Sequence, residues 1–531
     1  MFEAAVPSSA CGRGRSAAPD PRWSLVVAVL GSGMAFLDGT VVNVALPVMQ
    51  RSLGATVAEV QWIVEAYALL LASLVLVGGA LGDRLGRRRV FSAGIVLFAT
   101  ASAGCGLAPR VELLIAARAV QGVGAALAVP GSLALISAAY PERARGAAIG
   151  TWSAWTAITA SFGPVAGGWV VSHASWRWLF FFNVPVAALV VVLARRKVQE
   201  TRDLDASPRL DLAGAALATA GLGLMVYALV DSGRIGGPPA GLGTQRTLAP
   251  LLLGVLTLAT FVAVEARRAS PMVPLSLFRS RTFAGANLLT LLLYAALGGA
   301  LFFVPFNLIQ VQHYRPTAAG ASLLPFVLLI STMSRKTGAL AARIGPRPLL
   351  CAGPLFAAAG FALLAFPALG GSYWRTFFPG IVVLGIGMGL TVAPLTAAVM
   401  GAVDPRHAGV ASGINNAVAR TAGLLAIAAL GLLLVQRFNH TLDGALARLS
   451  LSPIVLAAVD GQRHRLGAAD FSAFDGALRG PLRAAFESAY VAAFRTLMIA
   501  SAALAFLAAL VGLVWITDRP SPPATGSPAP R

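Results

Sequence analysis

Long apolar stretches separated by short basic loops dominate this sequence. Fourteen of them are long enough to cross the hydrocarbon core of a bilayer, which takes about 20 residues of α-helix. They are residues 25–47, 60–81, 90–107, 113–139, 144–171, 178–194, 212–230, 248–264, 283–310, 318–337, 349–369, 377–403, 409–435 and 490–516. The pattern predicts an all-α polytopic membrane protein with 14 transmembrane helices.

The composition agrees with this class. Of 531 residues, 57% are hydrophobic and 12% are charged, whereas about a quarter of the residues of an ordinary soluble domain are charged. The net charge is +20, but the arginines form short clusters between apolar runs, which argues against nucleic acid as a partner. Three scattered cysteines and five histidines without ligand spacing predict neither a disulfide framework nor a metal site.

Basic residues gather in alternate loops, and this asymmetry predicts the orientation. The loops with several basic residues are 84–89, 143–145, 195–197, 267–281 and 343–347. Their side is predicted to be the cytoplasm, so that both termini lie inside a cytoplasmic membrane. Six arginines in the connection 436–488 weaken the assignment, because that connection must lie outside; it is predicted to be an external flap with an amphipathic turn.

An internal repeat divides the chain into two halves. Residues 79–88 read Gly-Ala-Leu-Gly-Asp-Arg-Leu-Gly-Arg-Arg, and residues 338–347 read Gly-Ala-Leu-Ala-Ala-Arg-Ile-Gly-Pro-Arg. The register pairs the loop after the second helix with the loop after the tenth. The predicted parts are a cytoplasmic tail (1–23), a six-helix bundle (24–195), a cytoplasmic connector (196–211), two inserted helices (212–266), a second six-helix bundle (267–517) and a disordered cytoplasmic tail (518–531).

Two of the charged residues inside predicted membrane helices of the first half could form a pair. Asp38 is in the middle of the first helix, where a carboxylate is costly unless it faces water or a partner. Proton handling is therefore preferred to a salt bridge that only holds helices together. Arg118 in the fourth helix also needs a counter-charge, and Asp38 is the candidate.

Other polar residues in the apolar runs mark a possible substrate cavity. Glu65 has two equally weighted interpretations, an interfacial residue beside aromatic side chains or a binding residue. Arg420 either binds an anion or pairs with Asp38 or a backbone carbonyl, and the sequence does not choose. The residues predicted for this cavity are Asn43, Glu65, Gln121, Asn416 and Arg420.

The fifth helix combines small residues with a proline. Residues 163–168 read Gly-Pro-Val-Ala-Gly-Gly, so that Gly163, Gly167 and Gly168 form a smooth face and Pro164 removes a backbone hydrogen bond. Such a helix can rock against a neighbour. A static helix contact of the GxxxG type is the alternative.

Together, these segments resemble the fourteen-helix branch of the major facilitator superfamily, the drug:proton antiporter family 2, which includes multidrug exporters. The resemblance covers nearly the whole chain and rests on residues 37–47, 79–88, 118–124, 163–168 and 176–185. It implies a major facilitator fold, a proton relay that contains Asp38 and Arg118, and an antiporter motif in the fifth helix.

The resemblance also implies a conformational latch in the loop 79–88. Asp83 would lock the outward-facing state by pairing with the second half. The latch residues are Gly79, Asp83, Arg84, Gly86, Arg87 and Arg88. The second copy departs from the pattern, because Ala342 replaces the carboxylate and Pro346 stiffens the turn, so an equal latch in both halves is not expected.

The expected function is proton-coupled efflux of small lipophilic molecules by a monomer in contact with membrane lipids, with the proton gradient as energy source and no cofactor. An exporter of one endogenous metabolite and a uniporter or importer of the same fold are alternatives. A polytopic membrane enzyme would need a cluster of His, Asp or Glu at a membrane face, and the sequence contains none. The identity of the substrate does not follow from the sequence.

Overall fold

The computed structural model describes residues 21–202, 211–231, 245–268, 271, 273–404, 408–449 and 451–517, and the regular elements of these residues are helices. The predicted disordered tails fall mainly on residues 1–20 and 518–531, outside the described residues. The first helix already begins at Pro21. The helices of the first half are α1 (Pro21–Leu53), α2 (Val57–Leu85), α3 (Arg87–Leu107), α4 (Val111–Ala139), α5 (Glu142–His173), α6 (Trp178–Phe181) and α7 (Asn183–Lys197).

The rest of the chain continues the same construction. The inserted pair is α8 (Leu212–Asp231) and α9 (Gln245–Arg267). The later helices are η1 (Leu275–Arg279), α10 (Arg281–Phe306), η2 (Asn307–Val311), α11 (Pro316–Ala321), α12 (Leu324–Ile344), α13 (Arg347–Leu364), α14 (Tyr373–Thr376), α15 (Phe378–Gly401), α16 (Ala408–Ala447), α17 (Pro453–Asp460), η4 (Arg463–Ala468) and α18 (Gly476–Trp515).

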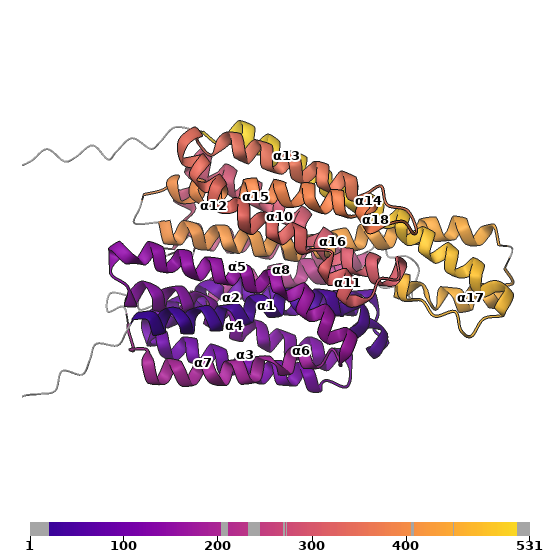
Figure 1. Ribbon diagram of the computed structural model, residues 1–531, viewed down its shortest axis with the longest axis horizontal. Coiled ribbons are helices and arrows are strands. Elements are labelled where there is room, and N and C mark those ends of the chain that lie inside the picture. Colours follow the sequence, from indigo (N-terminus) through magenta and orange to yellow (C-terminus); the bar gives the residue numbers. More distant parts are fainter. Residues whose placement is uncertain are drawn as a thin grey trace, which may run out of the picture.

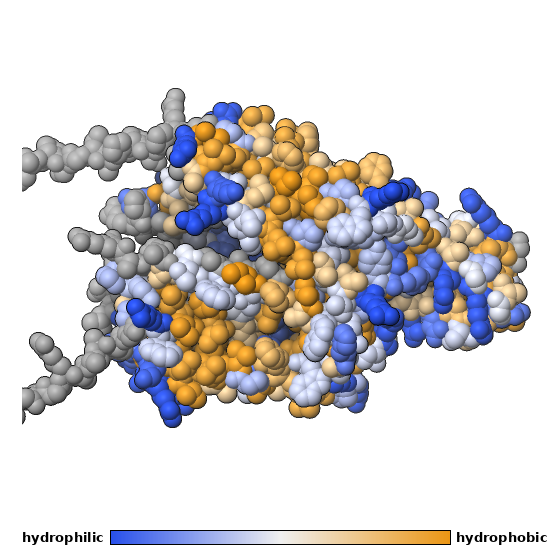
Figure 2. Space-filling model, in the orientation of Figure 1, coloured by the Kyte–Doolittle hydropathy of each residue, from blue (hydrophilic) through white to orange (hydrophobic). Residues whose placement is uncertain are grey.

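Thirteen helices in the described residues are long and apolar enough to span a membrane. They cover every predicted span except the fifth, which lies in α5, a helix of 32 residues that packs along α1. Several side chains of α5 lie outside the described part. The all-helical, polytopic fold class is confirmed, and apolar side chains cover much of the outer surface of both halves in Figure 2.

Two predicted continuous spans are interrupted. The sixth, residues 178–194, is divided at Phe182 into α6 and α7. The tenth, residues 318–337, is divided between Ala321 and Leu324 into α11 and α12. Prolines lie near both interruptions, at Pro185 and Pro325, where the missing N–H favours a break or the first turn of a new helix.

The two halves repeat the same packing scheme, and Figure 1 shows them as two groups of helices lying side by side. The pairs α1/α5, α2/α4 and α3/α4 of the first half correspond to α10/α16, α12/α15 and α13/α15 of the second. The repeated loops also agree in detail. Gly86 and Gly345 both have a positive φ, of 115° and 84°, as glycine allows.

Equivalent arginines follow these glycines. Arg88 donates a hydrogen bond to the Val198 carbonyl after α7, and Arg347 donates to the Leu513 carbonyl in α18. Each arginine thus ties its loop to the last long helix of its own half. This equivalence supports the register of the internal repeat.

The halves meet through α5 with α11 and through α2 with α16. A Cβ atom on Gly320 would lie only 2.0 Å from the Pro164 carbonyl oxygen, and one on Gly168 would lie 2.4 Å from the Pro316 carbonyl oxygen. Gln61 on α2 donates to the Ile427 carbonyl on α16. Small residues therefore allow the backbones of the two halves to touch.

The described residues of 436–488 form a helical hairpin, where the sequence predicted an external flap with an amphipathic turn. The 40-residue helices α16 and α18 are each about 60 Å long at 1.5 Å per residue, so they extend beyond the hydrocarbon layer. The rings of Phe438, Phe471 and Phe486 pack together and give the hairpin its own apolar core. It projects from one end of the molecule in Figure 1, called the hairpin end; the opposite end, with the loop Leu85–Arg87, is the loop end.

Candidate functional site

A buried ion pair joins α1 to α4 inside the first half. Asp38 and Arg118 are 2% and 1% exposed, and the Arg118 Nη1 atom donates to the Asp38 Oδ2 atom at 2.5 Å. The Gln121 Nε2 atom donates to the Asp38 Oδ1 atom at 3.0 Å. The predicted pairing of Asp38 with Arg118 is thus present.

Arg118 is held from several directions besides the carboxylate. Its Nε atom donates to the Ile63 carbonyl at 3.0 Å, and its Nη1 atom also donates to the Gln121 Oε1 atom at 2.8 Å. Its guanidinium carbon lies 4.2 Å from the centre of the Tyr67 ring, a cation–π distance. Helices α2 and α4 thus supply contacts to Arg118 in addition to the ion pair with Asp38 on α1.

Asn183 completes the cluster, and the sequence reasoning did not select it as a site residue. Its Nδ2 atom donates to the Asp38 Oδ1 atom at 3.2 Å and to the Ser102 Oγ atom at 3.0 Å. The interruption after Phe182 places Asn183 at the start of α7. The sequence offered one signal for this residue, an asparagine that lies two residues before a proline inside an apolar run.

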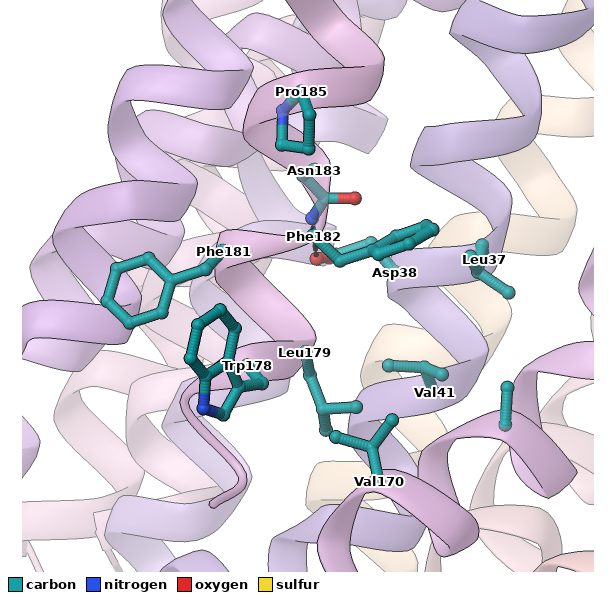
Figure 3. Close-up of a pocket in the computed structure, with 11 residues that line it drawn as sticks. Leu37, Asp38, Val41, Val170, Trp178, Leu179, Phe181, Phe182, Asn183 and Pro185 are labelled. Atoms are coloured by element: carbon teal, nitrogen blue, oxygen red, sulfur yellow. Dashed lines mark hydrogen bonds between the residues drawn. The ribbon is translucent and has the colours of Figure 1, made fainter. Parts of the chain in front are cut away.

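Asp38 also lies at the floor of a pocket of about 380 Å³ between α1, α5, α6 and α7, here called the lateral pocket (Figure 3). The walls of the pocket are apolar or aromatic, and the polar residues at its floor are Asp38 and Asn183. The lining residues are Leu37, Asp38, Val41, Ala166, Val170, Trp178, Leu179, Phe181, Phe182, Asn183 and Pro185.

A second cavity of about 270 Å³ lies between the two halves, here called the inter-half cavity. Thr40, Asn43 and Ser331 are its polar lining residues, and the Oδ1 atom of Asn43 is buried without a hydrogen bond. The remaining lining residues are Val44, Pro164, Leu301, Pro305, Leu323, Phe326, Val327 and Ile330. A cavity of this character accepts a small apolar molecule with a hydrogen-bond donor.

The structure separates the other residues predicted for a substrate cavity. Of the five, Asn43 lines the inter-half cavity, whereas Gln121 is fully buried in the ion-pair cluster. Asn416 is exposed on α16 and donates to the Ser412 carbonyl. Asn43, Gln121 and Asn416 thus have different surroundings among the described residues, and a substrate cavity shared by all five residues stays a prediction.

Glu65 is fully buried, and neither oxygen of its carboxyl group has a hydrogen-bond partner among the described residues. Both interpretations of Glu65 stay predictions, and burial of a carboxyl group without a hydrogen-bond partner is costly.

Arg420 does not pair with Asp38, which Arg118 already holds. Its guanidinium carbon lies 5.9 Å from the centre of the Phe36 ring. Among the described residues it has neither an ion pair nor a carbonyl acceptor. Of the alternatives considered for Arg420, anion binding stays a prediction.

Comparison with known proteins identifies the family of this chain. Residues 28–428 match the sequence model of the Major Facilitator Superfamily. The chain belongs to the major facilitator superfamily. It is a transporter, as the homologues also indicate, and not an enzyme.

Its relatives include resistance proteins, in agreement with the resemblance to the drug:proton antiporters. The chain is 35% identical over 444 residues to the multidrug resistance protein Stp of Mycobacterium tuberculosis (strain CDC 1551 / Oshkosh), covering 83% of this chain and 80% of Stp. It is 37% identical over 469 residues to the puromycin resistance protein pur8 of Streptomyces alboniger, covering 86% and 89%.

A solved structure agrees with the superfamily fold. The crystal structure of a bacterial homolog of the human lysosomal transporter Spinster, inward-facing and unoccupied, aligns with a TM-score of 0.64 at 17% identity. The alignment covers 95% of this chain and 99% of that one.

In this superfamily member, the predicted latch residues lie at the loop end. Asp83 accepts a hydrogen bond from Arg87 at 2.8 Å, a pairing within its own loop, and its pairing with the second half stays a prediction. Arg88 and Arg89 lie 3.6 and 3.7 Å from Glu200. Arg84 is exposed, and a Cβ on Gly79 would contact Pro130 on α4.

The glycines of the predicted antiporter motif divide between two neighbours of α5. Cβ atoms on Gly163 and Gly167 would meet Thr40 and Val41 of α1, whereas one on Gly168 would meet Pro316 at the start of α11. Helix α5 is therefore packed between the first half and the second, at a position from which movement of α1 can reach the contact between the halves.

Proposed function

We propose that this major facilitator transporter exports small lipophilic molecules in exchange for protons. The hairpin end would face outward from a cytoplasmic membrane, and the loop end would face the cytoplasm together with both termini. The basic loops at the loop end favour this orientation. The two halves would expose the inter-half cavity alternately to each side, in a monomer without a cofactor.

The buried pair of Asp38 with Arg118 carries the proposal. Asp38 is a carboxyl group near the middle of a membrane helix, and its charge is balanced by a single cation in a site of low dielectric. Intramembrane ionisable groups are rare and mark sites such as proton relays and substrate or ion pathways. A proton on Asp38 would replace the attraction to Arg118 by a weaker hydrogen bond.

The consequence for transport passes through α1. Asp38 faces the interior of the first half, whereas Thr40 and Asn43 of the same helix face the inter-half cavity. Arg118 would stay on Ile63, Gln121 and Tyr67 when Asp38 becomes neutral, so that α1 gains freedom relative to α4. Movement of α1 would then alter the substrate cavity and its packing on α5, weaken substrate binding and permit the return step.

The lining of the inter-half cavity supports a lipophilic and uncharged substrate. Its lining residues include no charged side chain, and burial of an ion without a partner is unfavourable. Neither Asp38 nor Glu65 lines this cavity.

The test is Asp38→Asn in proteoliposomes with an imposed pH gradient, with radiolabelled puromycin and the dye ethidium as probes. We expect the variant to lose gradient-driven uptake by at least tenfold and to retain exchange of probe across the membrane without a gradient. Glu112→Gln, which removes an exposed carboxylate from the first turn of α4, should behave like the unaltered protein. Undiminished gradient-driven uptake by Asp38→Asn would refute the proton role.

A second candidate is export of a single compound, favoured by the relative named as a puromycin resistance protein. A susceptibility panel of cells with and without the gene separates the two. Protection against many unrelated lipophilic compounds supports multidrug export, whereas protection against one compound supports the narrow function.

A further inference from the structure

The lateral pocket opens toward the lipid and not toward the second half. On α5, Pro164 and Gly168 face α11, while Ala166 and Val170 line the pocket on a different side of the helix. Phe162 and Trp169 flank that side and are exposed. Large apolar side chains exposed on a membrane helix face the hydrocarbon of the bilayer.

The opposite wall of the pocket is also a lipid-facing surface. Trp178 and Phe182 are 60% and 59% exposed although both line the pocket. A molecule dissolved in the bilayer can therefore reach the floor between α5 and α7 without entering the inter-half cavity. The pocket lies toward the hairpin end, since it is formed by the last turns of α5 and by α6.

The floor of the pocket offers hydrogen-bond acceptors and no free donor. Asn183 uses its amide group to donate to Asp38 and Ser102, and a carboxylate partner fixes which end of the amide carries hydrogen. Its oxygen accepts no hydrogen bond from the described residues, and it points away from Asp38 in Figure 3. The indole nitrogen of Trp178 points away from the floor in the same view.

The site as a whole is electrically balanced. The charge of Asp38 is already matched by Arg118, so a cationic ligand would lose its hydration without meeting an uncompensated charge. An anion would find no free donor. A neutral ligand with one O–H or N–H group can donate a hydrogen bond to the floor, and its apolar body can pack against the walls.

We propose that the lateral pocket is a binding site for a neutral amphiphile that enters from the bilayer and donates one hydrogen bond to Asn183 or Asp38. Its volume of about 380 Å³ is within the range of about 300–1,000 Å³ of small-molecule sites. The same chemistry belongs to the hydroxyl of a monoacyl lipid and to that of an aromatic alcohol. Binding would place a ligand beside the ion pair of the proposed proton site, which is the part of this proposal that rests on the proposed function.

The test uses the full chain in phosphatidylcholine nanodiscs and a long-chain alcohol with a diazirine group near its hydroxyl. Light-induced labelling, located by mass spectrometry, should fall on peptides that contain Val170 or residues 178–183 and should saturate with probe concentration. An alkane diazirine without the hydroxyl should label these peptides at least fivefold less. Equal labelling by both probes would overturn the proposal.

Two pocket variants and one control keep the result interpretable. Ala166→Trp and Val170→Phe fill the pocket and should each reduce labelling at least fivefold. Ala263→Trp, on the exposed face of α9, should not. Cooperative thermal unfolding of each variant establishes that it is folded, and unchanged labelling in both folded pocket variants would overturn the assignment.

Competition distinguishes the two sources of ligand. Displacement of the probe by monoolein supports a lipid occupant, whereas displacement by 2-naphthaleneethanol supports an aromatic small molecule; displacement by neither would overturn the site. Labelling does not depend on transport, so the proposed binding site and the proposed proton-coupled function can be refuted independently of each other.

Discussion

Asp38 and Arg118 together show why a charged pair can persist within an apolar bundle. Removal of both ions from water is costly, and their attraction offsets that cost only with good geometry and additional hydrogen bonds. Here Gln121 and Asn183 bind the carboxylate, and Ile63 and Tyr67 bind the guanidinium. The pair therefore contributes little net stability, but neutralising one of its two residues leaves the other charge buried without a partner.

Removal of the arginine should destabilise the protein more than removal of the whole pair. Arg118→Met leaves Asp38 buried without a counter-ion, and the loss of one partner of a buried ion pair typically costs about 3–5 kcal/mol. The double variant Asp38→Asn with Arg118→Met leaves no uncompensated charge, and we expect it to recover most of this loss. Unfolding of the single and double variants in mixed micelles measures the coupling.

Additive effects of the two substitutions would contradict this interpretation of the cluster. Gln121 and Asn183 would then stabilise the carboxylate without help from Arg118. Arg118→Lys is a useful companion variant, because a lysine cannot reproduce the separate contacts to Ile63, Asp38 and Gln121.

At the scale of elements, the hairpin connects the two halves at one end of the molecule. The Nε2 atom of Gln310 donates to the Gln50 Oε1 atom at 2.9 Å, linking η2 of the second half to α1 of the first. Gln50 in turn donates to the Arg465 carbonyl in η4 at 3.5 Å. Leu466 beside it is 2% exposed and has a positive φ of 50°, so packing holds it in an unfavourable conformation. Separation of the halves at this end requires η4 to leave α1.

Docking of η4 should weaken in acid. Burial and the charge of Arg465 lower the pKa of His464 in the docked segment, with Glu59 acting in the opposite direction. A released His464 has its ordinary pKa of about 6.5, so the released segment binds more protons as the pH falls below that value. Intrinsic amide exchange slows in acid, so the opening is measured as the protection factor, the ratio of the intrinsic to the observed exchange rate. The protection factors of residues 463–468 should therefore fall between pH 7.5 and 5.5.

His464→Gln should remove this fall in the protection factors. His440→Gln is the matched control, because His440 is exposed on α16 of the same hairpin. An acid-induced loosening that persists in His464→Gln would assign the effect to another group.

At the scale of the molecule, α1 separates two cavities with different access. Leu37, Asp38 and Val41 face the lateral pocket, whereas Thr40 and Asn43 face the inter-half cavity. A proton and a transported molecule would therefore act on the same helix without competing for the same atoms. Coupling then depends on movement of α1 and not on direct displacement.

The matching loops 79–88 and 338–347 predicted the repeat. Hydrophobic patterning was sufficient to predict the helical fold, because the bilayer imposes the length and spacing of the spans. It also identified Asp38 and Arg118, since charges are rare and costly in that environment. The pattern could not predict that Gln121 joins the ion-pair cluster or that Glu65 is fully buried, because the direction of a side chain depends on how its helix is rotated. The hairpin was missed because its core unites Phe438 with Phe471 and Phe486, which no local pattern links.

The distance between the two repeated loops, measured by electron paramagnetic resonance, tests most directly whether Asp38 controls movement of the halves. Spin labels at Arg84→Cys and Arg343→Cys would occupy exposed positions at the loop end, after replacement of Cys11 and Cys351 by alanine. The unaltered protein should shift toward the longer distance as the pH falls, because protonation permits the return of the loop end to its open state. Asp38→Asn should show the longer distance at every pH; a shift with pH identical to that of the unaltered protein would contradict control by Asp38.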